Sequence, residues 1–94
     1  MIRVLVVDDS PLMCKILTNI LNCDPEILVA AVATNGKEAV ELVPRLKPDI
    51  ITMDIDMPVM DGLEATKQIM AYHPIPILIV SSAVFRVGME KVFN

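Results

Sequence analysis

Four short apolar runs alternate with segments of helical periodicity along this chain, and the alternation limits its fold more than any other feature. Each run is rich in β-branched or other apolar residues and too short for a helix, which is typical of strands buried on both faces. The expected strands are Ile2 to Val7, Ile27 to Ala33, Asp49 to Met53 and Ile77 to Val80. Strands and helices in strict alternation form a parallel sheet with helices on both faces and right-handed crossovers. The sequence therefore predicts an α/β fold in three layers.

The segments between these strands carry the start signals of helices. Ser10, Asn35 and Asp61 each stand directly before a helical pattern, and all three residue types are favoured N-caps. The side chains expected to face the sheet are Leu12, Met13, Ile16, Leu17, Ile20 and Leu21 in the first helix, Ala39, Val40 and Val43 in the second, and Leu63, Thr66, Ile69 and Met70 in the third. A further helical stretch is expected at the end of the chain, about Arg86 to Asn94.

Length, charge and cysteine spacing exclude several classes of protein. At 94 residues the chain has room for one small domain. Its longest apolar run, Ile27 to Ala33, is far shorter than the roughly 20 residues of a membrane helix, so neither such a helix nor a signal peptide is expected. The net charge of -4 argues against nucleic acid as a direct partner. Cys14 and Cys23 are too far apart along one helix for a disulfide bond, and free thiols favour a cytoplasmic location.

Polar side chains stand at the ends of three expected strands. Asp8 and Asp9 follow the first strand, Asp54 follows the third, and Ser81 follows the fourth. In an open parallel sheet, binding sites lie beyond the carboxyl ends of the strands. If the first and third strands are neighbours, about 4.8 Å apart, the three aspartates lie close together at the same end of the sheet. The sequence therefore predicts an acidic cluster at this edge of the sheet.

Mutual repulsion sets the chemistry of such a cluster. Two like charges about 4 Å apart at an effective dielectric of about 20 repel by on the order of 4 kcal/mol, so the cluster must hold a proton, face water or bind a cation. No His or Cys ligand is expected nearby, and a set of oxygen ligands favours Mg²⁺. A carboxylate beside Mg²⁺ can attack a phosphoryl group and form an aspartyl phosphate. The hydroxyl of Ser81 is expected on the side where it can hydrogen-bond the phosphoryl oxygens.

Helix capping is the ordinary alternative role for an aspartate at a strand-to-helix turn. Asp61 begins a helix, so capping is its expected role, and capping remains open for Asp9, which stands next to Ser10. Asp54 differs from both, because a loop of six residues separates it from the next helix. The capping alternative is therefore weakest for Asp54.

Three motifs at the strand ends resemble those of a known family. They are Val6 to Ser10 after the first strand, Met53 to Gly62 after the third and Val80 to Ser82 after the fourth. In these motifs the chain resembles the receiver domains of two-component response regulators. It resembles most of all the N-terminal receivers of the chemotaxis protein-glutamate methylesterases, in the stretches Asp9 to Met13, Asp24 to Ile27 and Val80 to Ser82. The resemblance implies a flavodoxin-like fold with strand order 2-1-3-4-5. Receivers have five βα units, so residues 1–94 are expected to form a receiver that is truncated after the fourth unit.

The resemblance also implies a role for each polar residue at the strand ends. It makes Asp54 the phosphoacceptor for a histidine kinase, with Asp9 and Asp54 as direct ligands of Mg²⁺. Asp8 would bind the metal mainly through water and Asp56 through its backbone carbonyl, while Ser81 matches the family's switch hydroxyl. No lysine of this chain matches the phosphate-pairing lysine. The implied partners are a histidine kinase and an output domain or downstream protein of a chemotaxis system.

The absent fifth unit has two expected consequences. Ile77 to Val80 becomes a bare apolar edge and Arg86 to Asn94 loses packing surface, so self-association through this edge or this helix is expected.

The methylesterase catalytic domain is absent from these 94 residues, so no substrate turnover is expected beyond Mg²⁺-dependent self-phosphorylation. An alternative is a truncated receiver that cannot be phosphorylated and acts only as an interaction module.

Two other classes of protein fit the sequence less well. Asp54 to Asp56 resembles the first motif of haloacid-dehalogenase phosphatases, but Pro58 stands where that family has Thr or Val. A flavin- or nucleotide-binding domain of similar topology would need a Gly-rich phosphate loop, and the three glycines of this chain form none. A receiver accounts for all three motifs.

Overall fold

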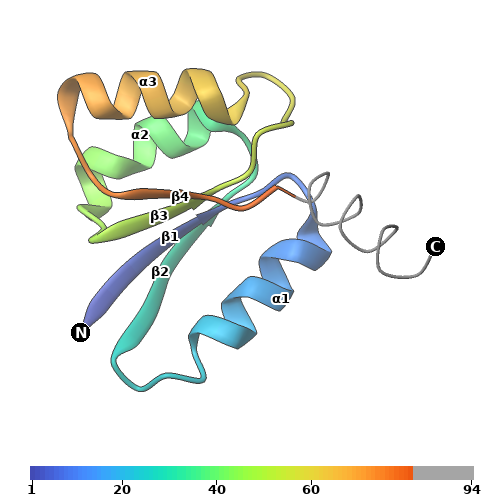
Figure 1. The fold of residues 1–94 in the computed structure, drawn as a ribbon, viewed down its shortest axis with the longest axis vertical. Coiled ribbons are helices and arrows are strands. Elements are labelled where there is room, and N and C mark those ends of the chain that lie inside the picture. Colours follow the sequence, from blue (N-terminus) through green and yellow to red (C-terminus); the bar gives the residue numbers. More distant parts are fainter. Residues whose placement is uncertain (82–94) are drawn as a thin grey trace.

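The computed structural model describes residues 1–81, which form four strands and three helices in alternation. In chain order they are β1 (Ile2–Val7), α1 (Pro11–Leu21), β2 (Ile27–Ala33), α2 (Gly36–Leu46), β3 (Ile50–Met53), α3 (Gly62–Tyr72) and β4 (Ile77–Ile79) (Figure 1). The three expected N-caps are confirmed, because the side chains of Ser10, Asn35 and Asp61 each accept a hydrogen bond from a backbone N–H of the first turn. The helix expected at Arg86 to Asn94 lies outside the described residues.

The strands form one parallel sheet in the order β2-β1-β3-β4. This order agrees with the one expected for the first four strands. The inner strand β1 is buried from Val4 to Val7, because it has a neighbouring strand on each side and helices on both faces. Val7 pairs with Ala33 of β2 and with Met53 of β3, so the carboxyl ends of these three strands lie side by side.

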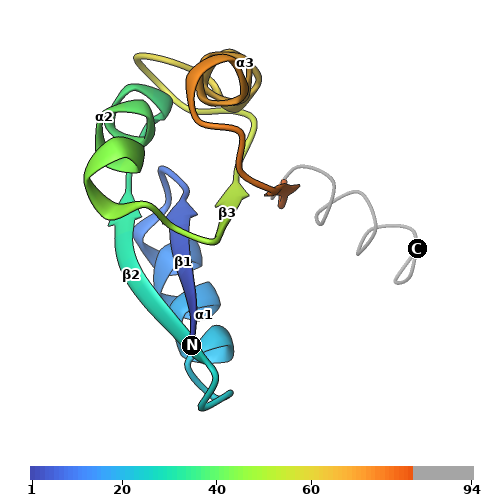
Figure 2. The same ribbon diagram turned by 90° about the vertical axis from the view of Figure 1, so that its left-hand side faces the viewer.

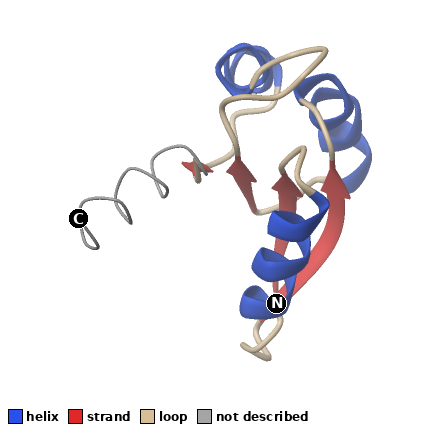
Figure 3. Cartoon of the chain, turned by 90° about the vertical axis from the view of Figure 1, so that its right-hand side faces the viewer, coloured by secondary structure: helices blue, strands red, loops and turns tan. Residues whose placement is uncertain are grey.

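Helices cover both faces of the sheet. Figures 1 and 2 show α2 and α3 on one face and α1 on the other, and Figure 3 shows α1 in front of the sheet from the opposite side. Successive side chains of a strand point to opposite faces, so β1 contributes to two cores. Leu5 and Val7 belong to the core under α2 and α3, while Val4 and Val6 belong to the core under α1. The predicted three-layer α/β fold is confirmed.

The inward face of α1 agrees only in part with the expected one. Its buried residue is Cys14, and Leu17 and Leu21 pack into the same core. Three residues expected in the core are instead exposed: Leu12 (66%), Ile16 (41%) and Ile20 (62%). An apolar pair occurs at every turn of this helix, so its apolar surface is wider than the strip that the sheet covers. The prediction was correct for Leu17 and Leu21 but wrong for the three exposed residues, because it favoured larger apolar side chains over the cysteine.

The expected inward face of α3 is only partly correct. Ile69 is buried as expected, but Leu63 and Met70 are 61% and 48% exposed. The start of α3 packs so closely on the backbone of Asp54 and on the start of α2 that only very small residues fit, and Gly62 and Ala65 are buried there. Close packing at one end of the helix therefore selects a narrower face than the apolar pattern predicted.

Helix α2 has the inward face that its sequence predicted. Ala39 and Val43 are buried, and Val40 packs against them. Two strands are one residue shorter than expected, since β3 begins at Ile50 and β4 ends at Ile79. Within the described part of the chain, no helix is long and apolar enough to cross a membrane.

Candidate functional site

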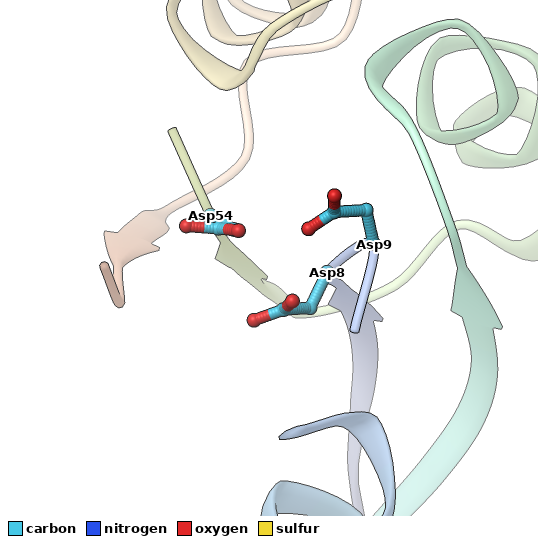
Figure 4. Close-up of side chains that lie close together, drawn as sticks. All are labelled: Asp8, Asp9 and Asp54. Atoms are coloured by element: carbon cyan, nitrogen blue, oxygen red, sulfur yellow. The ribbon is translucent and has the colours of Figure 1, made fainter. Parts of the chain in front are cut away.

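Three carboxylates meet beyond the carboxyl ends of β1 and β3 (Figure 4). One oxygen each of Asp8, Asp9 and Asp54 lies within 4.8 Å of the others. Asp8 and Asp54 are buried, with 1% and 3% of their surface exposed, while Asp9 is exposed to solvent. The acidic cluster that the sequence predicted is therefore formed, with two buried members and one at the surface.

Hydrogen bonds to the end of β2 and to the start of α1 hold Asp8 in place. Its backbone N–H donates to the carbonyl of Ala33 at the end of β2, at 3.0 Å. Its side-chain Oδ1 accepts a hydrogen bond from the N–H of Ser10 at 2.9 Å. Ser10 caps α1 through its own hydroxyl, which accepts from the N–H of Met13 at 3.2 Å. Because Ser10 is the cap, the capping alternative for Asp9 is wrong.

Asp54 is held by β1 and by the start of α3. Its backbone N–H donates to the carbonyl of Val7 at 2.9 Å, and its Oδ1 accepts from the N–H of Ile55 at 2.9 Å. Gly62 packs directly on this segment, and a Cβ on Gly62 would lie 1.9 Å from the carbonyl oxygen of Asp54. Asp61 caps α3 as expected, accepting from the N–H of Glu64 at 2.8 Å. Only a glycine at position 62 therefore allows α3 to approach the backbone of Asp54 so closely.

The loop between Asp54 and α3 is tied down at several points. Met57 is buried in the core under α2 and α3. The N–H of Met60 donates to the carbonyl of Pro58 at 2.7 Å, around Val59, whose φ of 69° is unfavourable for a β-branched residue. The carbonyl of Met60 in turn accepts from the N–H of Gly36 at the start of α2. The loop after Asp54 is thus folded into a strained turn that α2 and the core hold in place.

Burial and repulsion raise the pKa values of the two buried carboxyls. For Asp8, loss of solvent raises the pKa most, the N–H of Ser10 lowers it, and the charge of Asp9 raises it further. For Asp54, loss of solvent again raises the pKa most, followed by the charge of Asp8. The Oδ2 atom of Asp8 is buried and has no hydrogen-bond partner in the described residues. Ionised carboxylates can only accept hydrogen bonds, so a hydrogen bond between the side chains of Asp8 and Asp54 requires a proton on one of the two.

The donor set fits a hard divalent cation. All three side chains supply carboxylate oxygens, and the buried Oδ2 of Asp8 lacks a partner that a cation would provide. Mg²⁺ prefers oxygen ligands and keeps several positions for water and phosphate oxygens. The residues at this edge therefore have the chemistry that a Mg²⁺ site needs.

Two other predicted site residues lie near this edge outside the cluster. Ser81 follows β4, and the N–H of the preceding Val80 donates to the carbonyl of Met53 at 2.9 Å, so Ser81 lies at the same end of the sheet as Asp54. Asp56 is exposed in the loop after β3. Its side chain is not part of the carboxylate cluster, and the role of its backbone carbonyl stays a prediction.

Sequence reasoning missed two residues that shape the site. The thiol of Cys14 lies 3.2 Å from the backbone carbonyl oxygen of Asp8, a contact that the sequence did not predict, although Cys14 is not part of the carboxylate cluster. Spacing with Leu17 and Leu21 was the available signal, because the three share one helix face. Gly62 was read only as part of a motif, and no local pattern shows how closely a helix approaches a strand.

The fold and the acidic cluster together define a class of signalling domain. The family described as the response regulator receiver domain matches residues 4–92, so the chain belongs to the response regulator receiver family.

Curated relatives indicate which kind of response regulator the chain is most similar to. The chain is 58% identical over 89 residues to the protein-glutamate methylesterase/protein-glutamine glutaminase of Methanococcus maripaludis, covering 95% of this chain and 24% of that protein. It is 50% identical over 94 residues to the protein-glutamate methylesterase/protein-glutamine glutaminase 1 of Syntrophus aciditrophicus, covering 100% of this chain and 27% of that protein. The chain thus spans about a quarter of the length of these relatives.

Solved structures agree with the fold. The response regulator domain of Thermotoga maritima CheB has a TM-score of 0.85 and 50% identity, covering 87% of this chain and 61% of that one. CheY in a CheX–CheY–BeF3–Mg+2 complex from Borrelia burgdorferi is a weaker match, with a TM-score of 0.81 and 33% identity, covering 86% and 62% of the two chains. The resemblance to receivers, and to those of methylesterases among them, is confirmed.

Proposed function

We propose that the chain accepts a phosphoryl group on Asp54 from a histidine kinase and so acts as the phosphoacceptor of a chemotaxis two-component system. The observation that carries this proposal is the position of Asp54 in a buried acidic cluster with Asp8 and Asp9. Its Oδ1 accepts a hydrogen bond from Ile55, whereas Oδ2 has no such bond within residues 1–81. One oxygen is therefore held and the other is free to act as a nucleophile.

The transfer is a simple exchange of bonds to phosphorus. A carboxylate oxygen of Asp54 forms the new P–O bond as the P–N bond of the phosphohistidine breaks. The histidine nitrogen leaves with the bonding electron pair and takes up a proton. Two hydrogen bonds hold Asp54, and the strained loop after it is itself held in place. Together they keep the nucleophile in position before the phosphoryl group arrives.

The proposed direct ligands of Mg²⁺ are the side chains of Asp9 and Asp54 and the backbone carbonyl of Asp56. Asp8 is proposed to bind the metal mainly through water. When bound, Mg²⁺ supplies positive charge that offsets repulsion between the carboxylates and the incoming phosphoryl oxygens. The unpartnered Oδ2 of Asp8 supports this assignment. A relative in the receiver family, the Borrelia burgdorferi CheY, is described in a complex with BeF3 and Mg+2.

Ser81 is the proposed switch hydroxyl. Its place at the end of β4, at the same sheet edge as Asp54, is compatible with a hydrogen bond to a phosphoryl oxygen on Asp54. The proposed partners are a histidine kinase, an output domain or downstream protein, and a second copy of this chain. The proposed place of action is the cytoplasm.

Phosphorylation in the presence of Mg²⁺ tests the proposed function. Acetyl phosphate, phosphoramidate or a phosphorylated histidine kinase should label the wild type on Asp54, and borohydride trapping followed by peptide mass analysis locates the modified residue. Asp54→Asn should lose the label, while Asp56→Asn and Asp61→Asn should keep it. Label on Asp56 or Asp61 would show that the nucleophile is another residue. No label from any donor would leave the chain as an interaction module only.

A further inference from the structure

A buried thiol reaches the backbone of the acidic cluster from α1. Cys14 is the fourth residue of α1 and is 7% exposed. Its Sγ lies 3.2 Å from the backbone carbonyl oxygen of Asp8, and the thiol donates because a carbonyl can only accept. Within residues 1–81, no other hydrogen bond to this carbonyl is found. The thiol therefore satisfies a carbonyl that apolar surroundings would otherwise leave without a partner.

This bond is one of three that restrain Asp8. The others are the N–H of Asp8 to Ala33 in β2 and the N–H of Ser10 to Oδ1 of Asp8. Together they tie the residue to β2, to the start of α1 and, through Cys14, to the body of α1. The one polar atom of the side chain left without a partner in the described residues is Oδ2, which is buried. A cation at the cluster would meet an oxygen whose position these three bonds set.

We propose that Cys14 is a positioning residue for this cluster: its hydrogen bond to the carbonyl of Asp8 holds Asp8 and the neighbouring Asp9 against α1 and so strengthens binding of a divalent cation. The proposal rests on the proposed function, because Mg²⁺ is the cation concerned. Cys14 touches neither the cation nor the phosphoryl group in this scheme. It acts through the backbone of Asp8.

Packing is the competing explanation, since Cys14 also belongs to the core with Val4 and Val6. The two explanations predict opposite rankings for two substitutions. Cys14→Val keeps an apolar side chain of similar size but removes the donor, whereas Cys14→Ser keeps a donor but places a polar group in an apolar core. A packing role ranks Val above Ser in every property. A positioning role ranks Val above Ser in unfolding temperature but Ser above Val in Mg²⁺ affinity.

Cys23 provides a matched control within the same chain. Its thiol also lies 3.2 Å from a backbone carbonyl, that of Asn19, but it is exposed and lies just beyond the other end of α1. Cys23→Val removes a thiol hydrogen bond of the same length without touching Asp8. It should leave the Mg²⁺ affinity of the protein unchanged.

Calorimetric titration of the metal-depleted full chain with Mg²⁺, combined with thermal unfolding, tests the proposal. Cys14→Val should lower the association constant about threefold, and Cys14→Ser should stay within about twofold of wild type. The inference fails if Cys14→Val binds Mg²⁺ like wild type, or if Cys14→Ser loses as much affinity as Cys14→Val. A wild type that binds no Mg²⁺ would instead overturn the metal site of the proposed function, and this inference with it.

Discussion

Two buried carboxyls at the ends of β1 and β3 oppose folding when they are ionised. Loss of solvent, followed by repulsion from neighbouring charges, raises the pKa values of Asp8 and Asp54 above the ordinary value of 3.8. A carboxyl with a higher pKa in the folded than in the unfolded chain binds more protons when folded. Its stabilising contribution is therefore present at low pH and is lost as pH rises from 3.8 through the raised pKa values. Without metal, the cluster destabilises the protein at neutral pH.

Asp8→Asn should remove this destabilisation. We expect the metal-free variant at pH 7 to gain about 1 kcal/mol in free energy of unfolding, because one of two close like charges is removed. Its stability should also fall less than that of wild type as pH rises above 3.8, because only one buried carboxyl with a raised pKa remains. Urea unfolding with a chelator, repeated with Mg²⁺, measures both effects, and Mg²⁺ should stabilise the variant less than the wild type. Glu41→Gln, which neutralises an exposed carboxylate on α2, is the control. A metal-free Asp8→Asn less stable than wild type at pH 7 contradicts the argument.

Most of the acidic site was predictable at the level of single residues. Asp8, Asp9 and Asp54 directly follow strands, and parallel topology brings the carboxyl ends of neighbouring strands together whatever the side-chain packing. The contact of Cys14 was not predictable in this way, because a thiol on an inward helix face has the same pattern whether it packs or donates. The closeness of Gly62 to Asp54 depends on how α3 sits on the sheet. Local sequence carries information about strand ends but little about such distances.

At the scale of helices, predictability depended on how sharply the apolar residues are confined to one side. In α2, charged residues such as Lys37, Glu38 and Glu41 occupy the other sides, so one inward face remains and it was predicted correctly. In α1 the only charged residue is Lys15, and apolar residues extend around much of the helix. The pattern then establishes that a helix forms but leaves its rotation to packing. The same applies to the exposed Leu63 and Met70 of α3.

Two neighbouring residues of α3 test its rotation. Ile69 is 2% exposed and Met70 is 48% exposed. Ile69→Ala should cost about 2–4 kcal/mol of unfolding free energy because it leaves a cavity in the core, while Met70→Ala should cost no more than about 0.5 kcal/mol. Urea denaturation gives both values, and Ile69→Val, at about 1 kcal/mol, provides a milder variant if the alanine variant does not fold. Equal costs at positions 69 and 70 would mean that α3 presents another face.

At the scale of the whole molecule, the two edges of the sheet differ. The edge strand β2 pairs with β1 over most of its length, whereas β4 has three residues, each paired with β3. Two of these three are apolar and exposed: Leu78 at 56% and Ile79 at 41%. An edge strand presents unpaired backbone groups, and apolar side chains on it favour pairing with another chain. Within residues 1–81, β4 is therefore an edge strand suited to contact a second copy.

Self-association through β4 is the last prediction. Light scattering over a concentration series should show the mass of the wild type rising above that of one chain, and Leu78→Lys should shift it back, because a charge on an edge strand opposes pairing. Leu28→Lys, on the opposite edge and at a residue 44% exposed, is the matched control and should still associate. Association that survives Leu78→Lys would mean that the contact lies outside β4. A monomer that unfolds cooperatively at high concentration would mean that the chain closes its own core and that the β4 edge needs no partner.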